Sequence, residues 1–387
     1  MVAYVGVTPL AEAVLAGRSR RRTMVWLDAT RMVLLVPFAF ATSGWQIAVL
    51  ALLFFAVSSG FTPMFQSVIP DILPDEASYG RALALSRVAY TLESILSPVI
   101  AAGVLRLISG EQLFLVAAAS FVGSILALLA TRFPPDTGDR RKGPFLARAM
   151  KGLWIYRQTP RLRGVILMNF ALSIAMAWVL VNTAVFAAAK LGDAERFYPM
   201  LMAGYGVGAA AGALLVPRML RRLDERQVML AGAVLHAVLG LGILIAAGFA
   251  GYLVLWAQFV EDASLEETRG GQEIARSARP VDRPAAFAAQ FSLSHSGWLV
   301  AYPLAGWLAA RIGLEPALLV LSALCLAVAG LAARVWPAHD PLERAHDHPE
   351  LPADHPHLRE AGHAGGGHRH HYFIDELHPH WASGRPA

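Results

Sequence analysis

Apolar residues along this chain are gathered into long blocks that short polar connections separate. Blocks of this kind occupy residues 46–68, 113–131, 164–189, 228–247 and 314–333. A helix needs about 20 predominantly apolar residues to cross the hydrocarbon core of a bilayer, and these blocks meet that requirement. The pattern therefore predicts a protein whose helices cross a membrane several times.

Eleven such helices are predicted along the whole chain, and they define the fold class as an all-α membrane protein. Glycine and proline occur inside several of them, as close packing of membrane helices allows. The predicted helices cover residues 1–16, 24–42, 46–68, 82–107, 112–131, 164–189, 198–220, 228–247, 248–267, 284–311 and 314–335.

Positive charges are concentrated in alternate connections between the predicted helices. Arginine and lysine follow the first, fifth, seventh and ninth helices, whereas the connections "TSGW", "ISGEQ", "LGDAERF" and "IGLEP" contain few. Connections rich in Lys and Arg remain in the cytoplasm. We therefore expect a bacterial plasma (inner) membrane protein whose C-terminal segment is cytoplasmic.

The longest basic connection divides the predicted helices into five and six. This predicts an N-terminal helical half at residues 1–133, a cytoplasmic linker at 134–163, a C-terminal half at 164–336 and a tail at 337–387. A surface helix is expected within the linker, in "PFLARAMKGLWIYRQ". We expect the positive charge of the linker to contact anionic lipid headgroups, and not nucleic acid.

Composition agrees with this class and argues against several others. Apolar residues make up 56% of the chain and charged residues 16%, with a net charge of +5. The single cysteine, Cys325, lies in the last apolar block, which argues against disulfide or redox roles. The phosphate-binding glycine loop, the nucleophile elbow and the zinc-hydrolase spacing are absent. We therefore expect neither enzyme activity nor an organic cofactor.

Eleven of the thirteen histidines lie in residues 337–387. Many form His-x-His pairs, and in an extended chain residues two apart point the same way, so that each pair can present both imidazoles to one ion. Imidazole is a good ligand for Ni, Cu and Zn. The alternative is a histidine-biased segment without fixed structure. The candidate metal ligands are His346, His348, His355, His357, His363, His368, His370, His371, His378 and His380.

The stretch "PLAEAVLAGRSRRRTMVWLDATR" and the division into five and six helices resemble the major facilitator superfamily. The resemblance implies a two-half helical bundle with pseudo-repeated halves, here without the first helix of the superfamily. It also implies a gating loop, for which Arg18, Arg21 and Arg22 are the candidates. Gly17 stands where the superfamily pattern has an aspartate, so the match at this loop is partial.

Three further stretches are similar to the nickel-resistance branch of that superfamily. They are "IPDILPDEASYGRALALSRVAYTLESILSP", "ARSARPVDRPAAFAAQFSLSHSGWLVAYPLAGWL" and the histidine-rich end of the chain. The stretch "VEDASLEETRGGQEI" is more acidic than that branch leads us to expect. The resemblance implies a monomeric secondary transporter that exports Ni²⁺, with Co²⁺ or Zn²⁺ as alternatives, by proton antiport, and so confers metal resistance.

Titratable residues inside predicted membrane helices are candidates for the transport path, because burying charge in a bilayer is costly. Arg81 precedes Glu93 by the interval that separates Arg283 from His295. If the two halves repeat, as the resemblance implies, Glu93 and His295 face a shared central site. A packed polar pair is the alternative.

The acidic residues Glu261 and Asp262 follow the apolar run "GYLVLWAQFV". They are further transport-path candidates, at an acidic entrance that attracts cations; an ordinary acidic loop is the alternative. Asp28 and Arg31 stand one helical turn apart and are expected to form a structural ion pair.

Two other functions are compatible with the same residues. One is export of an organic compound, such as a drug or a siderophore, with the tail only modulating transport. The other is a membrane sensor or scaffold that does not transport, in which metal binding to the tail alters contact with a partner.

Overall fold

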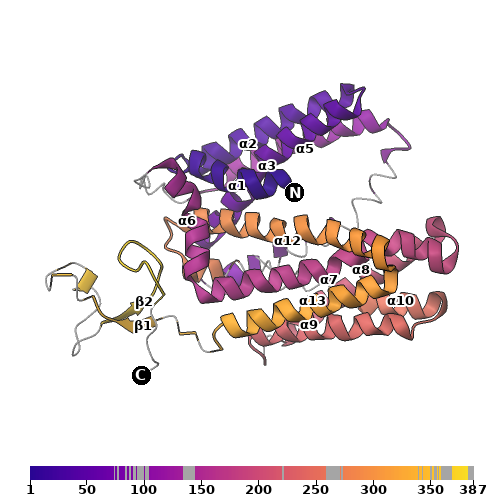
Figure 1. The fold of residues 1–387 in the computed structure, drawn as a ribbon. Helices are drawn as coiled ribbons and strands as arrows, with labels where there is room; N and C mark the ends of the chain where they lie inside the picture. Colours follow the sequence, from indigo (N-terminus) through magenta and orange to yellow (C-terminus); the bar gives the residue numbers. More distant parts are fainter. Residues whose placement is uncertain are drawn as a thin grey trace.

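The structure is a computed structural model, and its helices form two groups (Figure 1). It describes the chain except for residues 74, 76–77, 83–84, 87–88, 90–92, 94–99, 101–103, 134–143, 220–221, 259–270, 272, 339, 342, 349–350, 353–354, 356, 359–367 and 382–387. Apart from one short two-stranded sheet, the regular secondary structure of the described residues is helical.

The first group contains four helices whose bounds lie among the described residues. They are α1 (Val2–Leu15), α2 (Arg20–Leu35), which continues into a 3₁₀ turn at Val36–Phe40, α3 (Gly44–Ile72) and α5 (Gly110–Ala130). Serine begins the last two helices. At α5 the Ser109 hydroxyl accepts from the amide of Gln112 at 3.3 Å, and the Gln112 side chain accepts from the Ser109 amide at 3.0 Å. This reciprocal capping satisfies two amides that a helix start leaves unpaired.

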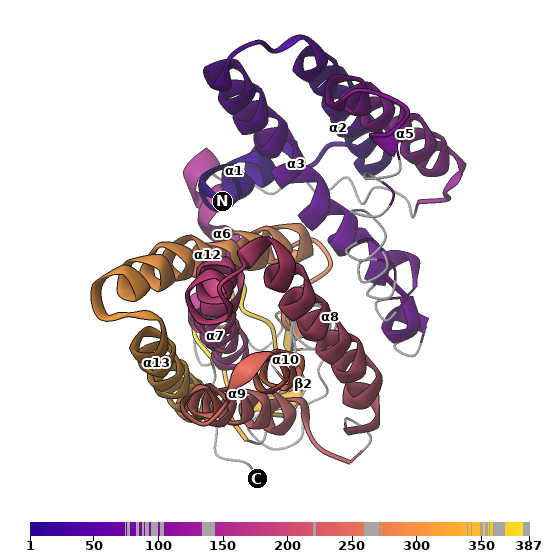
Figure 2. The same cartoon turned by 90° about the vertical axis from the view of Figure 1, so that its right-hand side faces the viewer.

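The second group packs around α7 (Pro160–Leu191), which lies against α12 (Arg283–Ile312) and α13 (Leu314–Val335). Its other helices are α8 (Ala194–Met219), α9 (Glu225–Leu241) with the 3₁₀ turn Gly242–Leu244, and α10 (Gly248–Gln258). Figure 2 shows several helices of this group nearly end-on, with α7 between α12 and α13. Two buried tryptophans in the core of this group also make hydrogen bonds. The Trp178 indole donates to the Leu314 carbonyl at 2.9 Å, and the Trp256 indole donates to the Thr183 hydroxyl at 3.0 Å.

Helix α6 (Phe145–Gln158) lies across one end of the bundle, between the two groups (Figure 1). It confirms the helix expected within the basic linker. The close approach depends on Gly152, because a Cβ atom there would lie 1.9 Å from the carbonyl oxygen of Ala285 in α12.

Six helices among the described residues are long and apolar enough to cross a membrane. They are Arg20–Phe40, Gly44–Ile72, Gly110–Ala130, Pro160–Leu191, Arg226–Leu244 and Leu314–Val335. In the apolar stretches of α3 and α5 only 22% and 11% of the residues are buried inside the protein. Such broad apolar surfaces are stable against lipid but not against water. The protein is therefore a multi-pass, all-α membrane protein, as predicted.

The predicted helices agree closely with the observed ones. Predicted 284–311 is Arg283–Ile312, predicted 314–335 is Leu314–Val335, and predicted 1–16 is Val2–Leu15. The bounds differ more at α2, which begins four residues earlier at Arg20 and whose α-helical part ends at Leu35. Helix α3 begins two residues earlier than predicted and continues through Pro63 and Pro70 to Ile72. Most of the predicted helix 82–107 and the end of 248–267 lie outside the described residues.

The two groups meet along α12, which packs against both α1 and α3. Ser292 of α12 donates to the backbone oxygen of Val5 in α1 at 2.6 Å. Three residues farther along α12, His295 meets the ring of Tyr4 edge-on at 4.8 Å between ring centres. The contact between the halves is thus partly polar at these positions.

The C-terminal segment folds back onto the bundle. Its strands β1 (Glu343–His346) and β2 (His368–His371) pair antiparallel, with His346 opposite His368 and Arg344 opposite His370. They lie beyond the start of α7 and near α6, at the left of Figure 1. We call this end of the bundle the tail end.

Candidate metal site and the contacts between the two halves

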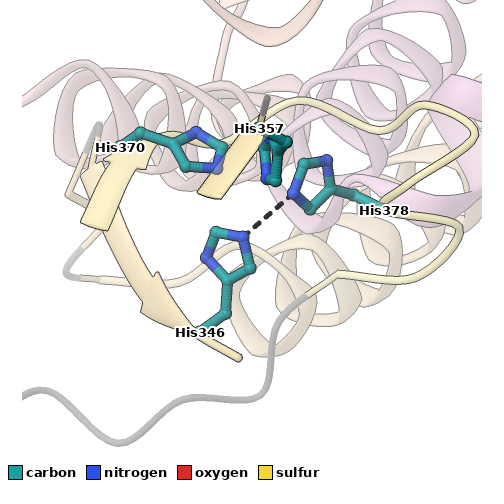
Figure 3. Close-up of side chains that lie close together, drawn as sticks. All are labelled: His346, His357, His370 and His378. Carbon is teal, nitrogen blue, oxygen red and sulfur yellow. Dashed lines mark hydrogen bonds between the residues drawn. The ribbon is translucent and has the colours of Figure 1, made fainter. Parts of the chain in front are cut away.

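Four imidazoles of the C-terminal segment converge on one point (Figure 3). They belong to His346, His357, His370 and His378, and one ring nitrogen from each lies within 4.8 Å of the corresponding nitrogen of every other. We call these residues the histidine cluster. Each comes from a different His-x-His pair, so four pairs contribute one ring each to a shared site. The sequence had suggested instead that one pair can present both of its rings to one ion.

Local structure explains how these four side chains meet. Arg344 and His370 are directly opposite in the β1–β2 ladder, which places His346 and His370 diagonally on one face of the strand pair. His357 lies between the strands, where it and Leu358 are helical. His378 follows a turn in which the carboxylate of Asp375 accepts the backbone amide of His378 at 2.9 Å. Aspartate commonly stabilises such turns in this way.

In three rings of the histidine cluster, the Nδ1 atom makes a hydrogen bond and thereby orients the ring. The Nδ1 of His346 contacts the Arg344 carbonyl at 3.1 Å, and the Nδ1 of His370 contacts the His371 carbonyl at 2.8 Å. The Nδ1 of His378 contacts the Asp375 carboxylate at 2.9 Å. Since these oxygens only accept, each Nδ1 must carry the proton, and each Nε2 then presents a lone pair. The cluster is therefore a set of preoriented nitrogen donors.

The nitrogen separations suit a bound cation. The Nε2 atoms of His346 and His378 are 2.9 Å apart, and those of His348 and His378 are 3.1 Å apart. Lone pairs this close repel one another unless a proton or a metal ion is shared between them. In a tetrahedral site with metal–nitrogen bonds of about 2.0–2.1 Å, the nitrogen atoms are roughly 3.3 Å apart. The donors present thus fit a transition-metal ion that prefers imidazole.

The charge state of the site also favours a cation. Burial tends to raise the pKa of Asp375, but hydrogen bonds from the side chain and backbone of His378, and the charges of His378 and Arg279, outweigh it and lower the pKa to about 2. Burial lowers the pKa of His370. The carboxylate is therefore ionised and the imidazole more readily neutral near neutral pH, which are the forms that metal binding requires.

A buried arginine docks the C-terminal segment onto the bundle. Arg161, at the start of α7, is 1% exposed; it donates to the Ser277 hydroxyl at 2.7 Å and to Asp340 at 3.1 Å. Its guanidinium also lies 5.0 Å from the ring centre of Trp381. Tyr372, beside the cluster, is 4% exposed. The described parts of the tail therefore have a packed structure, unlike the unstructured alternative.

The same end of the bundle carries an ion-pair set that joins the two halves. Asp71, at the end of α3, binds Arg20 of α2 and also binds Arg283 of α12 at 2.7 Å. Four residues before Arg283, Arg279 binds Asp282 at 2.9 Å and Asp375 of the tail at 3.2 Å. The histidine cluster and the contact between the halves are thus neighbours.

The predicted gating-loop residues were Arg18, Arg21 and Arg22, whereas the arginine of this stretch that binds Asp71 is Arg20. Arg18, Arg21 and Arg22 are exposed, and Arg21 donates to the Leu129 carbonyl of α5. Helical periodicity was the available signal. Thr23, Met24 and Leu27 are buried in α2, and they lie three, four and seven residues after Arg20, so that Arg20 shares their inward face.

The transport-path candidates are not all placed by the structure. His295 is half-buried, and its Nδ1 donates to the Phe291 carbonyl at 2.7 Å. Glu93 is exposed on its helix, and no described contact joins it to His295. Glu261 and Asp262 lie outside the described residues, as does His363.

Asp28 and Arg31 form the ion pair expected from their spacing. The Asp28 side chain is fully buried and also accepts from the Ser124 hydroxyl at 2.6 Å. The Arg31 guanidinium lies 4.0 Å from the ring centre of Phe61 and 4.9 Å from that of Phe121. A charged pair inside a membrane helix is therefore enclosed by aromatic and polar partners.

Comparison with known proteins relates the chain to membrane transporters. The family model described as Major Facilitator Superfamily matches residues 1–262. An uncharacterized MFS-type transporter, y4rN of Sinorhizobium fredii (strain NBRC 101917 / NGR234), is 24% identical over 239 residues, which are 58% of this chain and 58% of that protein. The match therefore covers less than two thirds of that relative's length.

Solved structures share the fold. The E. coli fucose:proton symporter FucP aligns with a TM-score of 0.63 at 19% identity, over 87% of this chain and 89% of that one. The human organic anion transporter MFSD10 (TETRAN) aligns with a TM-score of 0.68 at 17% identity, over 86% of this chain and 81% of that one. At these identities the likeness establishes the architecture of the bundle.

Proposed function

The chain belongs to the major facilitator superfamily of membrane transporters, and we propose that its cargo is a divalent transition-metal cation exported in exchange for protons. Ni²⁺ is the first candidate, with Co²⁺ and Zn²⁺ as alternatives. The observation that carries this proposal is the histidine cluster, in which three Nε2 lone pairs are preoriented by hydrogen bonds at Nδ1. Imidazole donors favour these ions over Mg²⁺ or Ca²⁺.

The expected orientation of the chain supports export. Connections rich in Lys and Arg remain in the cytoplasm, which supports a cytoplasmic tail in a bacterial cell, where an exporter encounters its cargo. Removing the ion from the cytoplasm would confer metal resistance. Within the bundle, His295 of α12 lies against Tyr4 of α1, and imidazole is a side chain that can accept and release a proton.

Transport in inside-out vesicles tests the proposal. The vesicles, acidified inside, present the cytoplasmic face outward, and the Ni, Co and Zn that they accumulate are measured by mass spectrometry. We expect the full chain to accumulate metal only while the proton gradient lasts, and a chain lacking residues 337–387 to require more external metal for the same rate. Metal accumulation no greater than in vesicles without the protein would refute metal export.

A second candidate cargo, an organic anion, is favoured by Arg31. This arginine lies in α2 near Tyr4, among Phe61 and Phe121. An anion that displaced Asp28 from Arg31 would gain a desolvated charge-assisted contact. Vesicles that take up a labelled organic anion but no metal would favour this candidate, with the tail then modulating transport.

A further inference from the structure

We propose that the histidine cluster is a regulatory metal site, whose occupancy favours the closed contact between the two halves at the tail end. The coupling runs from His378 through Asp375 and Arg279 to the ion pair between Arg283 and Asp71. This inference rests on the proposed function only for the class of ion that binds. It assigns to the cluster a role separate from carrying the transported ion.

The donor set favours a resident ion over one in transit. Four imidazoles, from His346, His357, His370 and His378, can fill all positions of a tetrahedral ion. Metal sites with every position filled by protein are usually structural, whereas sites that exchange a ligand keep a position open. A site on a transport path must also release its ion readily. The histidine cluster, whose four imidazoles fill every ligand position, is therefore suited to sensing the ion and not to passing it on.

Asp375 is the first link in the coupling, because its two oxygens serve different partners. Oδ1 accepts from the His378 ring at 2.9 Å, and Oδ2 accepts from Arg279 at 3.2 Å. A metal ion on Nε2 of His378 withdraws electron density from the ring and strengthens the Nδ1–H···Oδ1 hydrogen bond. Carboxylates in this position orient metal-bound histidines in many proteins. Metal binding therefore fixes the carboxylate that holds Arg279.

Arg279 is the second link, because it joins the tail to the start of α12. Its guanidinium also binds Asp282 at 2.9 Å, and the next residue, Arg283, binds Asp71 of α3 at 2.7 Å. The side chains of Asp71 and Arg283 are only 15% and 19% exposed. Charges with this degree of burial are screened less by salt than surface charges. The two ion-pair sets are joined by the backbone, in which the Arg283 amide donates to the Arg279 carbonyl at 3.0 Å. Together they connect a cluster ligand with the other half.

The direction in which metal binding acts follows because the assembled histidine cluster and the closed contact between the halves occur together in the structure. The cluster nitrogens lie within 4.8 Å of one another in the same arrangement in which Arg283 contacts Asp71. A ligand that binds one arrangement better shifts the population toward it, and the coupling is reciprocal. Metal on the cluster should therefore favour the arrangement in which the halves are closed at the tail end. In an exporter, that closure follows loading from the cytoplasm.

Distance measurements between spin labels test this coupling in the full chain. Labels at R132C and R222C, in a Cys325→Ala background, would report the separation of the halves, because both native residues are exposed at the tail end. Zn²⁺ is the probe, since it is diamagnetic and does not disturb the spin signal. We expect Zn²⁺ to raise the ratio of short to long distances about 5-fold or more, the low end of typical allosteric coupling.

Two arginine variants of the same segment separate coupling from tail docking. Arg279→Gln removes the link to Asp375 and should abolish the distance response, while zinc affinity measured by calorimetry changes by less than about 10-fold. Arg276→Gln is the matched control, because Arg276 is similarly exposed, at 35% against 37%, but binds Glu273 and Asp340. This control should keep the response.

The inference is overturned if Arg279→Gln responds to Zn²⁺ like the unaltered chain. It is equally overturned if the unaltered chain binds Zn²⁺ without a change in distances, or binds none at the cluster. Vesicle transport of the same variants distinguishes this failure from failure of the proposed function. Metal transport without a distance response removes only the regulatory role, whereas a distance response without metal transport removes only the proposed cargo.

Discussion

Replacing Asp375 with asparagine isolates the contribution of one carboxylate to metal binding by the tail. The change keeps the shape of the side chain and removes its charge. The lowering of the Asp375 pKa from 3.8 to about 2 corresponds to about 2 kcal/mol in favour of the ionised form. Because the carboxylate keeps some contact with water, we reduce this to about 1–2 kcal/mol. At 1.4 kcal/mol for each factor of ten, zinc affinity should fall roughly 10-fold.

Calorimetric titration of the purified full chain with Zn²⁺ measures this change. The matched control is Glu376→Gln, because Glu376 is the adjacent acidic residue and is exposed. The control should bind Zn²⁺ as the unaltered chain does. Unchanged affinity in Asp375→Asn, or an equal loss in Glu376→Gln, would refute the role assigned to the hydrogen bond between Asp375 and His378.

Three further predictions concern the path, the pH dependence and the packing. His295→Gln should lower metal transport at least about 10-fold, because a glutamine amide cannot accept and release a proton as an imidazole can. In the same assays the zinc affinity of the tail should stay unchanged, as should transport by the control Ser296→Ala. Zinc affinity should fall as pH drops below about 6.5, since protonated imidazoles cannot bind a metal ion. The contact that Asp375 makes with Arg279, by contrast, is fully present above about pH 4 and is lost only on further acidification, because the pKa of Asp375 is about 2. Zinc titrations across this pH range should therefore show that the metal ion is released before the tail undocks. Gly152→Ala should lower the melting temperature in detergent, with a cost of about 1–3 kcal/mol, because the added Cβ would lie 1.9 Å from the α12 backbone, whereas Gly123→Ala, with nothing within 4 Å, should not.

Local patterns in the sequence were sufficient for the membrane helices. The block at 314–333 becomes α13 (Leu314–Val335), and the block at 46–68 lies within α3 (Gly44–Ile72). These predictions succeed because the rise of a helix and the thickness of a bilayer are both nearly constant, so the length of an apolar block is informative by itself. Turn and cap signals were equally local, as Ser109 at the start of α5 shows.

Contacts between distant segments were beyond such patterns. Asp71 and Arg283 are separated by 212 positions, and their pairing depends on how α3 and α12 pack. Likewise, the imidazoles of His346 and His378 meet only because the chain between them folds back. Spacing along the chain suggested that Glu93 and His295 share a site, which stays a prediction. What the structure adds is that Tyr4 lies against His295.

The sequence by itself determined that this is a polytopic helical membrane protein with an imidazole-rich C-terminal segment, because hydropathy and ligand chemistry belong to the residues themselves. Only the tertiary structure decided which four imidazoles converge, that Arg20 and not its neighbours binds Asp71, and that Arg279 lies between the tail and α12. The physical reason is that these contacts depend on the relative positions of packed elements. Such positions are set by side-chain packing over the whole bundle and not by any short stretch of the chain.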